Sequence, residues 1–94
     1  MKWLEMIELR SVENHRELLE SQLQQLMYDV NKDADAQDIK AYHRVMLDTD
    51  VSIHLVHESP DADRNGSSLG LRLASSLREF GLVNHSVWIE ILSP

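Results

Sequence analysis

Apolar and polar residues alternate, or recur with helical spacing, in six segments of the chain. In residues 3–10, Ile7 and Leu9 share one side and polar residues occupy much of the other, which predicts a strand. After it, apolar residues follow the 3.6-residue period of an amphipathic helix. They are Leu19, Leu23, Leu26, Met27 and Val30.

Two further β-like runs, 39–47 and 51–58, flank the short polar segment 48–50. A hairpin with this segment as its loop pairs Leu47 with Val51, and it sets His54 opposite Arg44. This register gathers a set of apolar residues on one face, so burial favours it over a one-residue slip. The set is Val45, Leu47, Val51, Ile53 and Leu55.

A second helix is predicted after Ser67, which is a suitable N-cap residue. Its apolar stripe is Leu69, Leu73, Leu77 and Phe80. Gly81 stands where a left-handed residue often ends a helix, and in such an ending Leu82 contacts Leu77. The last predicted strand covers residues 86–92, where Val87, Ile89 and Ile91 alternate with Trp88, Glu90 and Leu92.

The predicted order is strand, helix, strand, strand, helix, strand. Short connections and right-handed crossovers favour an α+β fold of the ferredoxin-like β-α-β-β-α-β kind, with an antiparallel sheet and both helices on one face. The length of 94 residues suits a single domain, 1–94. The helix-covered side of the sheet is expected to carry Ile7, Leu9, Ile53, Leu55, Val87, Ile89 and Ile91.

The opposite side of the predicted sheet is neither wholly apolar nor wholly polar. It carries Met6, Glu8, Arg10, Tyr42, Arg44, Met46, Ser52, His54, Val56, Glu58, Trp88 and Glu90. A large exposed apolar patch usually marks a contact surface, whereas charged residues are costly to bury in a dry core. The mixture predicts a homodimer that packs sheet to sheet and leaves a partly apolar cavity for a small ligand.

Charge and cysteine content exclude several classes of protein. A net charge of −7 disfavours nucleic acid and acidic membrane surfaces as partners. No apolar run is long enough to cross a membrane. The chain contains no cysteine, so disulfides and thiolate metal sites are excluded and a cytoplasmic location is expected.

The element order, the length and the two-sided sheet resemble the dimeric α+β barrel superfamily, especially its small antibiotic-biosynthesis-monooxygenase-type domains. The most similar part is LGLRLASSLREFGLVNHSVW, residues 69–88. The resemblance implies a homodimer with a ligand cavity, and in some members oxygenation of aromatic compounds without metal or flavin. It implies no catalytic residue here, because the Asn, Trp and His constellation of the haem-degrading members has no clear counterpart.

His54 is the candidate catalytic residue, since a histidine beside a carboxylate can act as a general base near neutral pH. Glu58 shares its face and Arg44 is expected opposite, so these three also fit a purely structural polar cluster. The candidate ligand-binding residues are Tyr42, Arg44, Met46, Glu58 and Trp88.

No metal site or cofactor is expected. His43 and His57 fall on the helix side of the sheet and His54 on the other, so the three do not converge on one ion. His85 is interpreted as a turn residue. Two functions remain open: a dimer that binds an apolar or aromatic compound, with or without a cofactor-independent monooxygenase-like activity, and a non-catalytic regulatory or structural dimer. An amino-acid-sensing module is a third, weaker alternative.

Overall fold

The computed structural model describes residues 1–11, 16–33 and 38–94. Along the chain, the described elements are β1 (Lys2–Ser11), α1 (Arg16–Asp33), β2 (Asp38–Arg44), β3 (Leu47–Glu58), α2 (Ser68–Leu77) and β4 (Gly81–Ile89). The strands form one sheet in the order β2-β3-β1-β4, and every neighbouring pair is antiparallel. The predicted α+β class, with an antiparallel sheet and two helices, is confirmed.

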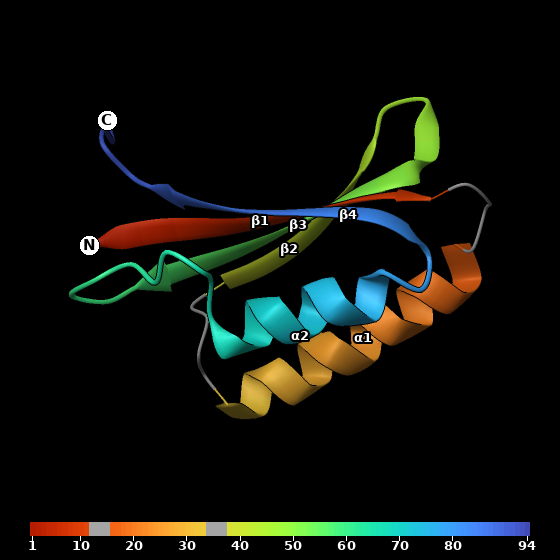
Figure 1. Cartoon of the computed structure of the whole chain (residues 1–94), viewed down its shortest axis with the longest axis horizontal. Coiled ribbons are helices and arrows are strands. Elements are labelled where there is room, and N and C mark those ends of the chain that lie inside the picture. The colour runs from red at the N-terminus through yellow and green to blue at the C-terminus, as the bar shows by residue number, and fades with distance from the viewer. Residues whose placement is uncertain (12–15, 34–37) are drawn as a thin grey trace.

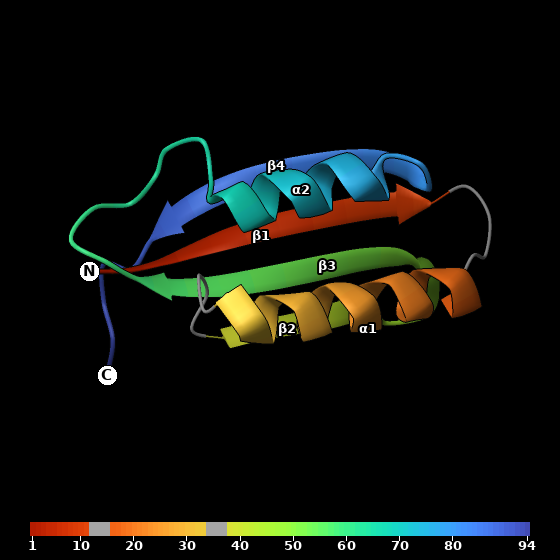
Figure 2. The same cartoon turned by 90° about the horizontal axis from the view of Figure 1, so that it is seen from below.

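Both helices lie against the same side of the sheet, which we call the helix face (Figure 1). Seen from that side, α2 runs along β1 and β4, while α1 runs along β3 and β2 (Figure 2). The other side, which we call the open face, has no described element over it. Because successive residues of a strand point to opposite sides, each strand contributes to both faces.

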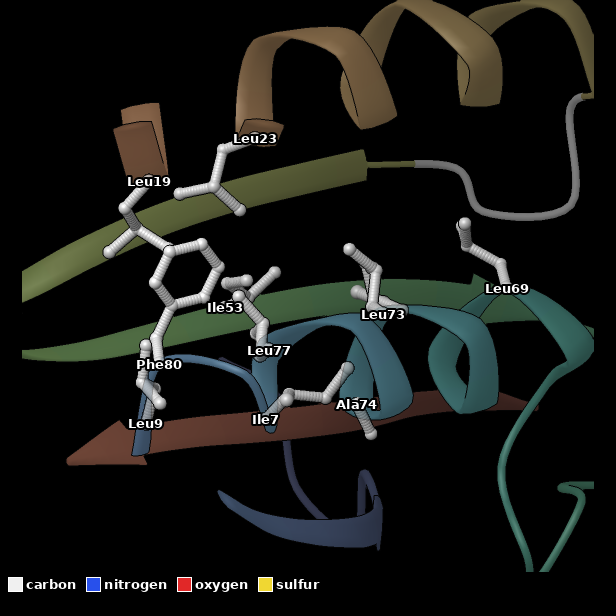
Figure 3. Close-up of a cluster of buried hydrophobic side chains, with 11 residues drawn as sticks. Ile7, Leu9, Leu19, Leu23, Ile53, Leu69, Leu73, Ala74, Leu77 and Phe80 are labelled. Carbon is white, nitrogen blue, oxygen red and sulfur yellow. The ribbon is translucent and has the colours of Figure 1, made fainter. Parts of the chain in front are cut away.

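The apolar core fills the space between the helices and the helix face (Figure 3). Its buried members are Ile7, Leu9, Leu19, Leu23, Ile53, Leu55, Leu69, Leu73, Ala74, Leu77 and Phe80. The predicted stripe of α2 is therefore confirmed, as are Leu19 and Leu23 of α1. The side chains of Leu26, Met27 and Val30, also predicted to face the core, lie outside the described part of the chain.

Helix α2 begins as predicted and ends differently. The Ser67 hydroxyl accepts a hydrogen bond from the Gly70 N–H at 3.0 Å, which caps the helix. Gly81, however, has no left-handed backbone and is the first residue of β4. A Cβ there would overlap the Arg10 carbonyl, so close strand pairing explains the glycine better than helix termination does. Leu82 is exposed on the open face and does not cover Leu77.

The predicted hairpin register was wrong. The connection is Val45-Met46, and β3 starts at Leu47, so Ala41 lies opposite Ile53 and His43 lies opposite Val51. Val45, expected in the core, is 84% exposed. The reason is that β2 is an edge strand with almost all of its side chains exposed, so burial does little to fix the register along it.

The last strand also differs from its predicted bounds. It starts five residues earlier than expected and ends at Ile89, after which the Glu90 N–H still donates to the Lys2 carbonyl at 3.0 Å. Val87 is half-buried on the helix face, but Ile89 is 53% exposed and Ile91 is 95% exposed. Ile91 therefore lies beyond the part of the sheet that the helices cover.

Among the described residues, no helix combines the length and the apolar character that a membrane crossing requires. The cytoplasmic location stays a prediction.

Candidate functional site

Most of the residues predicted for the second side of the sheet do lie on the open face. Pairing along β1 places Met6 opposite His54 and Glu8 opposite Ser52. The same alternation puts Tyr42 and Trp88 on this face, where they are 50% and 57% exposed. The open face therefore combines aromatic, aliphatic and charged side chains, as expected.

The predicted cluster of His54, Arg44 and Glu58 does not form. His54 lies opposite Lys40, because the true register of the hairpin differs from the predicted one. Arg44 instead donates from Nε to Oδ2 of Asp50 at 3.0 Å. Glu58 lies at the far end of β3, opposite Lys2.

His54 has polar and aromatic neighbours on the open face. Its Nε2 is 3.0 Å from the Ser52 hydroxyl, and its ring centroid is 4.9 Å from that of Tyr42. The structure thus unites His54 with one of the predicted ligand-binding residues, Tyr42. The contacts described for His54 include no carboxylate, so they do not supply the acid partner that the general-base hypothesis used.

Two other predicted ligand-binding residues lie away from this group. Met46 occupies the hairpin turn with a left-handed backbone, φ 69°, and is 96% exposed. Trp88 lies opposite Leu4, towards the start of β1, and its Nε1 donates to the Ser86 hydroxyl at 2.8 Å. Neither side chain therefore belongs to a shared site with Tyr42 and Arg44.

A hollow of about 540 Å³ opens at the hairpin end of the open face. Residues of the β2–β3 hairpin line it, and the turn end of this hairpin bends away from the helices (Figure 1). Its walls include the side chains Glu8, Arg10, Tyr42, Arg44, Asp50 and Leu82. We call it the hairpin hollow. Of the predicted site residues, it brings together Tyr42 and Arg44.

Two arginines from different strands meet one carboxylate at this hollow. Arg10 of β1 and Arg44 of β2 place their Nε atoms 3.8 and 3.0 Å from the same oxygen, Oδ2 of Asp50. The Asp50 side chain is 15% exposed, whereas those of Arg10 and Arg44 are 73% and 58% exposed. The carboxylate is therefore covered by two guanidinium groups that themselves face solvent.

A second polar cluster, on the helix face, was missed by the sequence analysis. Glu5 is fully buried, and its Oε2 lies 2.5 Å from Nε2 of His57 while its Oε1 lies 2.9 Å from Nε2 of His85. Ser67 donates to the same carboxylate twice, from its N–H at 2.9 Å and from its hydroxyl at 2.5 Å. We call these four residues the Glu5 cluster.

The Glu5 cluster connects three strands to the start of α2. A carboxylate oxygen accepts hydrogen bonds, so the arrangement fits histidine tautomers that carry the proton on Nε2. The negative charge also lies at the helix N-terminus, where the helix dipole favours it. Trp3 stacks on His57 with ring centroids 4.1 Å apart, and its Nε1 donates to the Ser59 hydroxyl at 2.9 Å.

The Glu5 cluster stabilises the fold and offers no space for a ligand at its carboxylate. Its carboxylate is sealed from solvent, and Gly66 and Gly70 pack so closely that a Cβ on either would overlap it. No group of three or more potential ligands suited to a metal ion is found in the described parts of the chain. We therefore place the candidate functional site at the hairpin hollow.

The sequence did contain a signal for the Glu5 cluster. Glu5, Ile7 and Leu9 are alternate residues of β1, so the alternation that buries Ile7 and Leu9 also buries Glu5. A buried carboxylate requires partners, which should have directed attention to histidines on the helix face. His57 was correctly assigned to that face, but His85 lies within β4 and the turn interpretation was wrong.

Comparisons with known proteins add no assignment. No family model matches the chain, and no curated protein or solved structure matches it at a significant level.

Proposed function

We propose that the chain is a ferredoxin-like domain that pairs with a second copy through its open face and binds a small aromatic or apolar compound in the hairpin hollow. This is the arrangement of the dimeric α+β barrel proteins. The observation that carries the proposal is the hollow itself, a space of about 540 Å³ beside the exposed ring of Tyr42.

The strand arrangement supports the fold assignment. Strands β1 and β2 are each antiparallel to β3, which lies between them, so they are parallel to one another and α1 connects them. In the same way, β3 and β4 are parallel on either side of β1, and α2 connects them. Two interleaved split β-α-β units are the basis of the ferredoxin-like fold.

Exposed apolar groups on the open face support a second copy as its occupant. Leu82 is 76% exposed and Trp88 is 57% exposed at the β4 side, while Tyr42 is half-exposed at the β2 side. Contact with the open face of a second copy would remove the apolar surface of these three side chains from water.

The size and lining of the hollow support ligand binding over a filled interface. Small-molecule sites typically enclose about 300–1,000 Å³ and combine apolar walls with a few polar groups. Tyr42 and Leu82 provide apolar surface, and Arg44, Asp50 and Ser52 provide polar groups.

A cofactor-independent oxygenase activity, with His54 as the base, stays a prediction, and a non-catalytic dimer is the alternative.

The oligomeric state tests the dimer. Sedimentation velocity of the wild type should give a dimer, and Trp88→Glu should shift it to monomer because the new charge would be buried without a partner. Leu71→Glu is the matched control, since Leu71 is 50% exposed on α2 and should leave the dimer intact.

Binding tests the hollow. In two-dimensional NMR, titration with the neutral compound 2-naphthalenemethanol should shift the amide signals of Tyr42, Arg44 and Asn84 in a saturable way. A wild type that stays monomeric at NMR concentrations overturns the dimer. An absence of saturable shifts at the hollow, with this compound and with analogues of it that carry a carboxylate or a phosphate, overturns ligand binding.

A further inference from the structure

The two arginines of the hairpin hollow hold one carboxylate but keep most of their hydrogen-bonding capacity. A guanidinium group has five N–H donors, and Arg44 uses its Nε to reach Asp50. Arg10 approaches the same oxygen at 3.8 Å, which is an ion pair without a hydrogen bond. Among the described residues, these are the contacts that the two guanidinium groups make.

Asp50 fixes where these donors lie. It comes from β3, between the strands that carry the two arginines, and its side chain is much less exposed than theirs. Both Nε atoms lie within 3.8 Å of one Oδ2, so the two guanidinium groups lie at the same place on the rim of the hollow. The two arginines thus share a single carboxylate, that of Asp50.

We propose that the hairpin hollow selects ligands that carry an anionic oxygen group, a carboxylate or a phosphate, on their aromatic or apolar body. Arg10 and Arg44 bind the anionic group with their terminal amino groups, and the ring of Tyr42 packs on the apolar body. This inference rests on the proposed ligand-binding function and specifies the chemistry of its ligand.

The other charges around the hollow determine how such a ligand lies. Glu8 lines the hollow on the same face, two residues before Arg10, and it repels an anion from the floor. The anionic group therefore sits at the hairpin rim with the apolar body towards β4. Because the chain carries a net charge of −7, its long-range field does not attract anions, and the selectivity comes from the two arginines.

The test compares three probes with the same ring system by NMR titration of the intact protein: 2-naphthoate, 2-naphthyl phosphate and the neutral 2-naphthalenemethanol. At low salt, at least one anionic probe should bind about tenfold tighter than the neutral one, in line with a charge-assisted hydrogen bond. The tighter of the two anions identifies the preferred group. Added salt should reduce the difference, because the arginines are exposed.

Variants assign the selectivity to the arginines. Arg44→Gln and Arg10→Gln should each lower the affinity for the preferred anionic probe much more than the affinity for 2-naphthalenemethanol, and so remove most of the preference for the anion. Lys40→Gln is the matched control, because Lys40 is a cation of the same open face, bound to Asp38 at 3.6 Å, and does not line the hollow. It should keep the preference.

Each outcome separates this inference from the function on which it rests. Equal affinity for the three probes at the hollow, or a preference that survives in both arginine variants, overturns the anion selectivity and leaves ligand binding standing. Failure of all three probes to shift the signals of Tyr42 and Asn84 overturns ligand binding itself.

Discussion

The imidazole Nε2 of His57 lies 2.5 Å from Oε2 of Glu5, and both side chains are almost completely buried. The contact joins β1 to β3 across the helix face, 52 residues apart in sequence. A buried carboxylate is tolerated only when donors surround it, and Glu5 receives hydrogen bonds from three other residues. The stability of the fold should therefore depend strongly on this one side chain.

Replacing Glu5 should destabilise the protein severely. In Glu5→Leu, the two histidines and the Ser67 N–H lose their acceptor in the interior, and each buried donor left without a partner costs about 1–3 kcal/mol. Urea unfolding followed by circular dichroism measures the loss. Glu79→Leu, at an exposed position, should change the free energy of unfolding by less than about 0.5 kcal/mol. Equal effects of the two changes would contradict the assigned role of Glu5.

Gly70→Ala should also destabilise, although alanine is normally the better helix residue by about 1 kcal/mol. Gly70 lies in α2, and the added methyl group would overlap the Glu5 carboxylate. We expect a loss of about 1–3 kcal/mol, as for other overpacked interiors. The Glu5→Ala background provides the control, because the smaller side chain leaves room for the methyl group. There, Gly70→Ala should be neutral or stabilising, and additive effects would be evidence against the contact.

Met46→Gly should stabilise the hairpin. The left-handed backbone of Met46 costs a residue with a Cβ about 1–2 kcal/mol, which glycine avoids. The side chain is 96% exposed, so little burial is lost, and a net gain of about 0.5–1 kcal/mol is expected in thermal or urea unfolding. Val45→Gly, next to it but without a positive φ, should lower stability. A loss in both variants would mean that the turn is placed wrongly.

Tryptophan fluorescence should report the proposed pairing of open faces. Trp3 is 5% exposed and Trp88 is 57% exposed, so Trp3→Phe leaves a single emitter on the open face. Acrylamide should quench it readily at low protein concentration and much less at high concentration, as the second copy covers it. In Trp88→Phe, quenching of the buried Trp3 should be weak at every concentration. Concentration-independent quenching of Trp88 would be inconsistent with the dimer.

The sequence predicted the elements well where a clear apolar pattern coincides with burial in the core. Leu69, Leu73 and Leu77 share one helical stripe, Ser67 is a good cap, and the central strand β3 buries Ile53 with its neighbours. It failed at the edge strand, where Val45 lies at the turn and every side chain of β2 except the partly buried Ile39 is exposed, so burial does little to fix the register. It also failed for Gly81, since local spacing could not reveal the backbone of Arg10 beside it.

For the site, the alternation of residues along each strand predicted the correct face of the sheet, but the predicted partners on neighbouring strands were wrong. Tyr42, His54 and Trp88 were assigned to the correct face, because alternation alone decides it. Their neighbours depend on the register, so the error in the hairpin gave Arg44 the wrong partner. The contact between Arg10 and Asp50 joins strands 40 residues apart, and no local pattern predicts such a pair.

The Glu5 cluster also sets conditions on how the chain can fold. Its hydrogen bonds join residue 5 to residues 57, 67 and 85, over separations of 52, 62 and 80 positions. If β1 slipped by one residue, the Glu5 carboxylate would turn to the open face and leave its donors buried without an acceptor. Only one register of β1 therefore satisfies the buried carboxylate. The contacts of that register form only when nearly the whole chain has come together, and such long-range contacts are associated with slow folding.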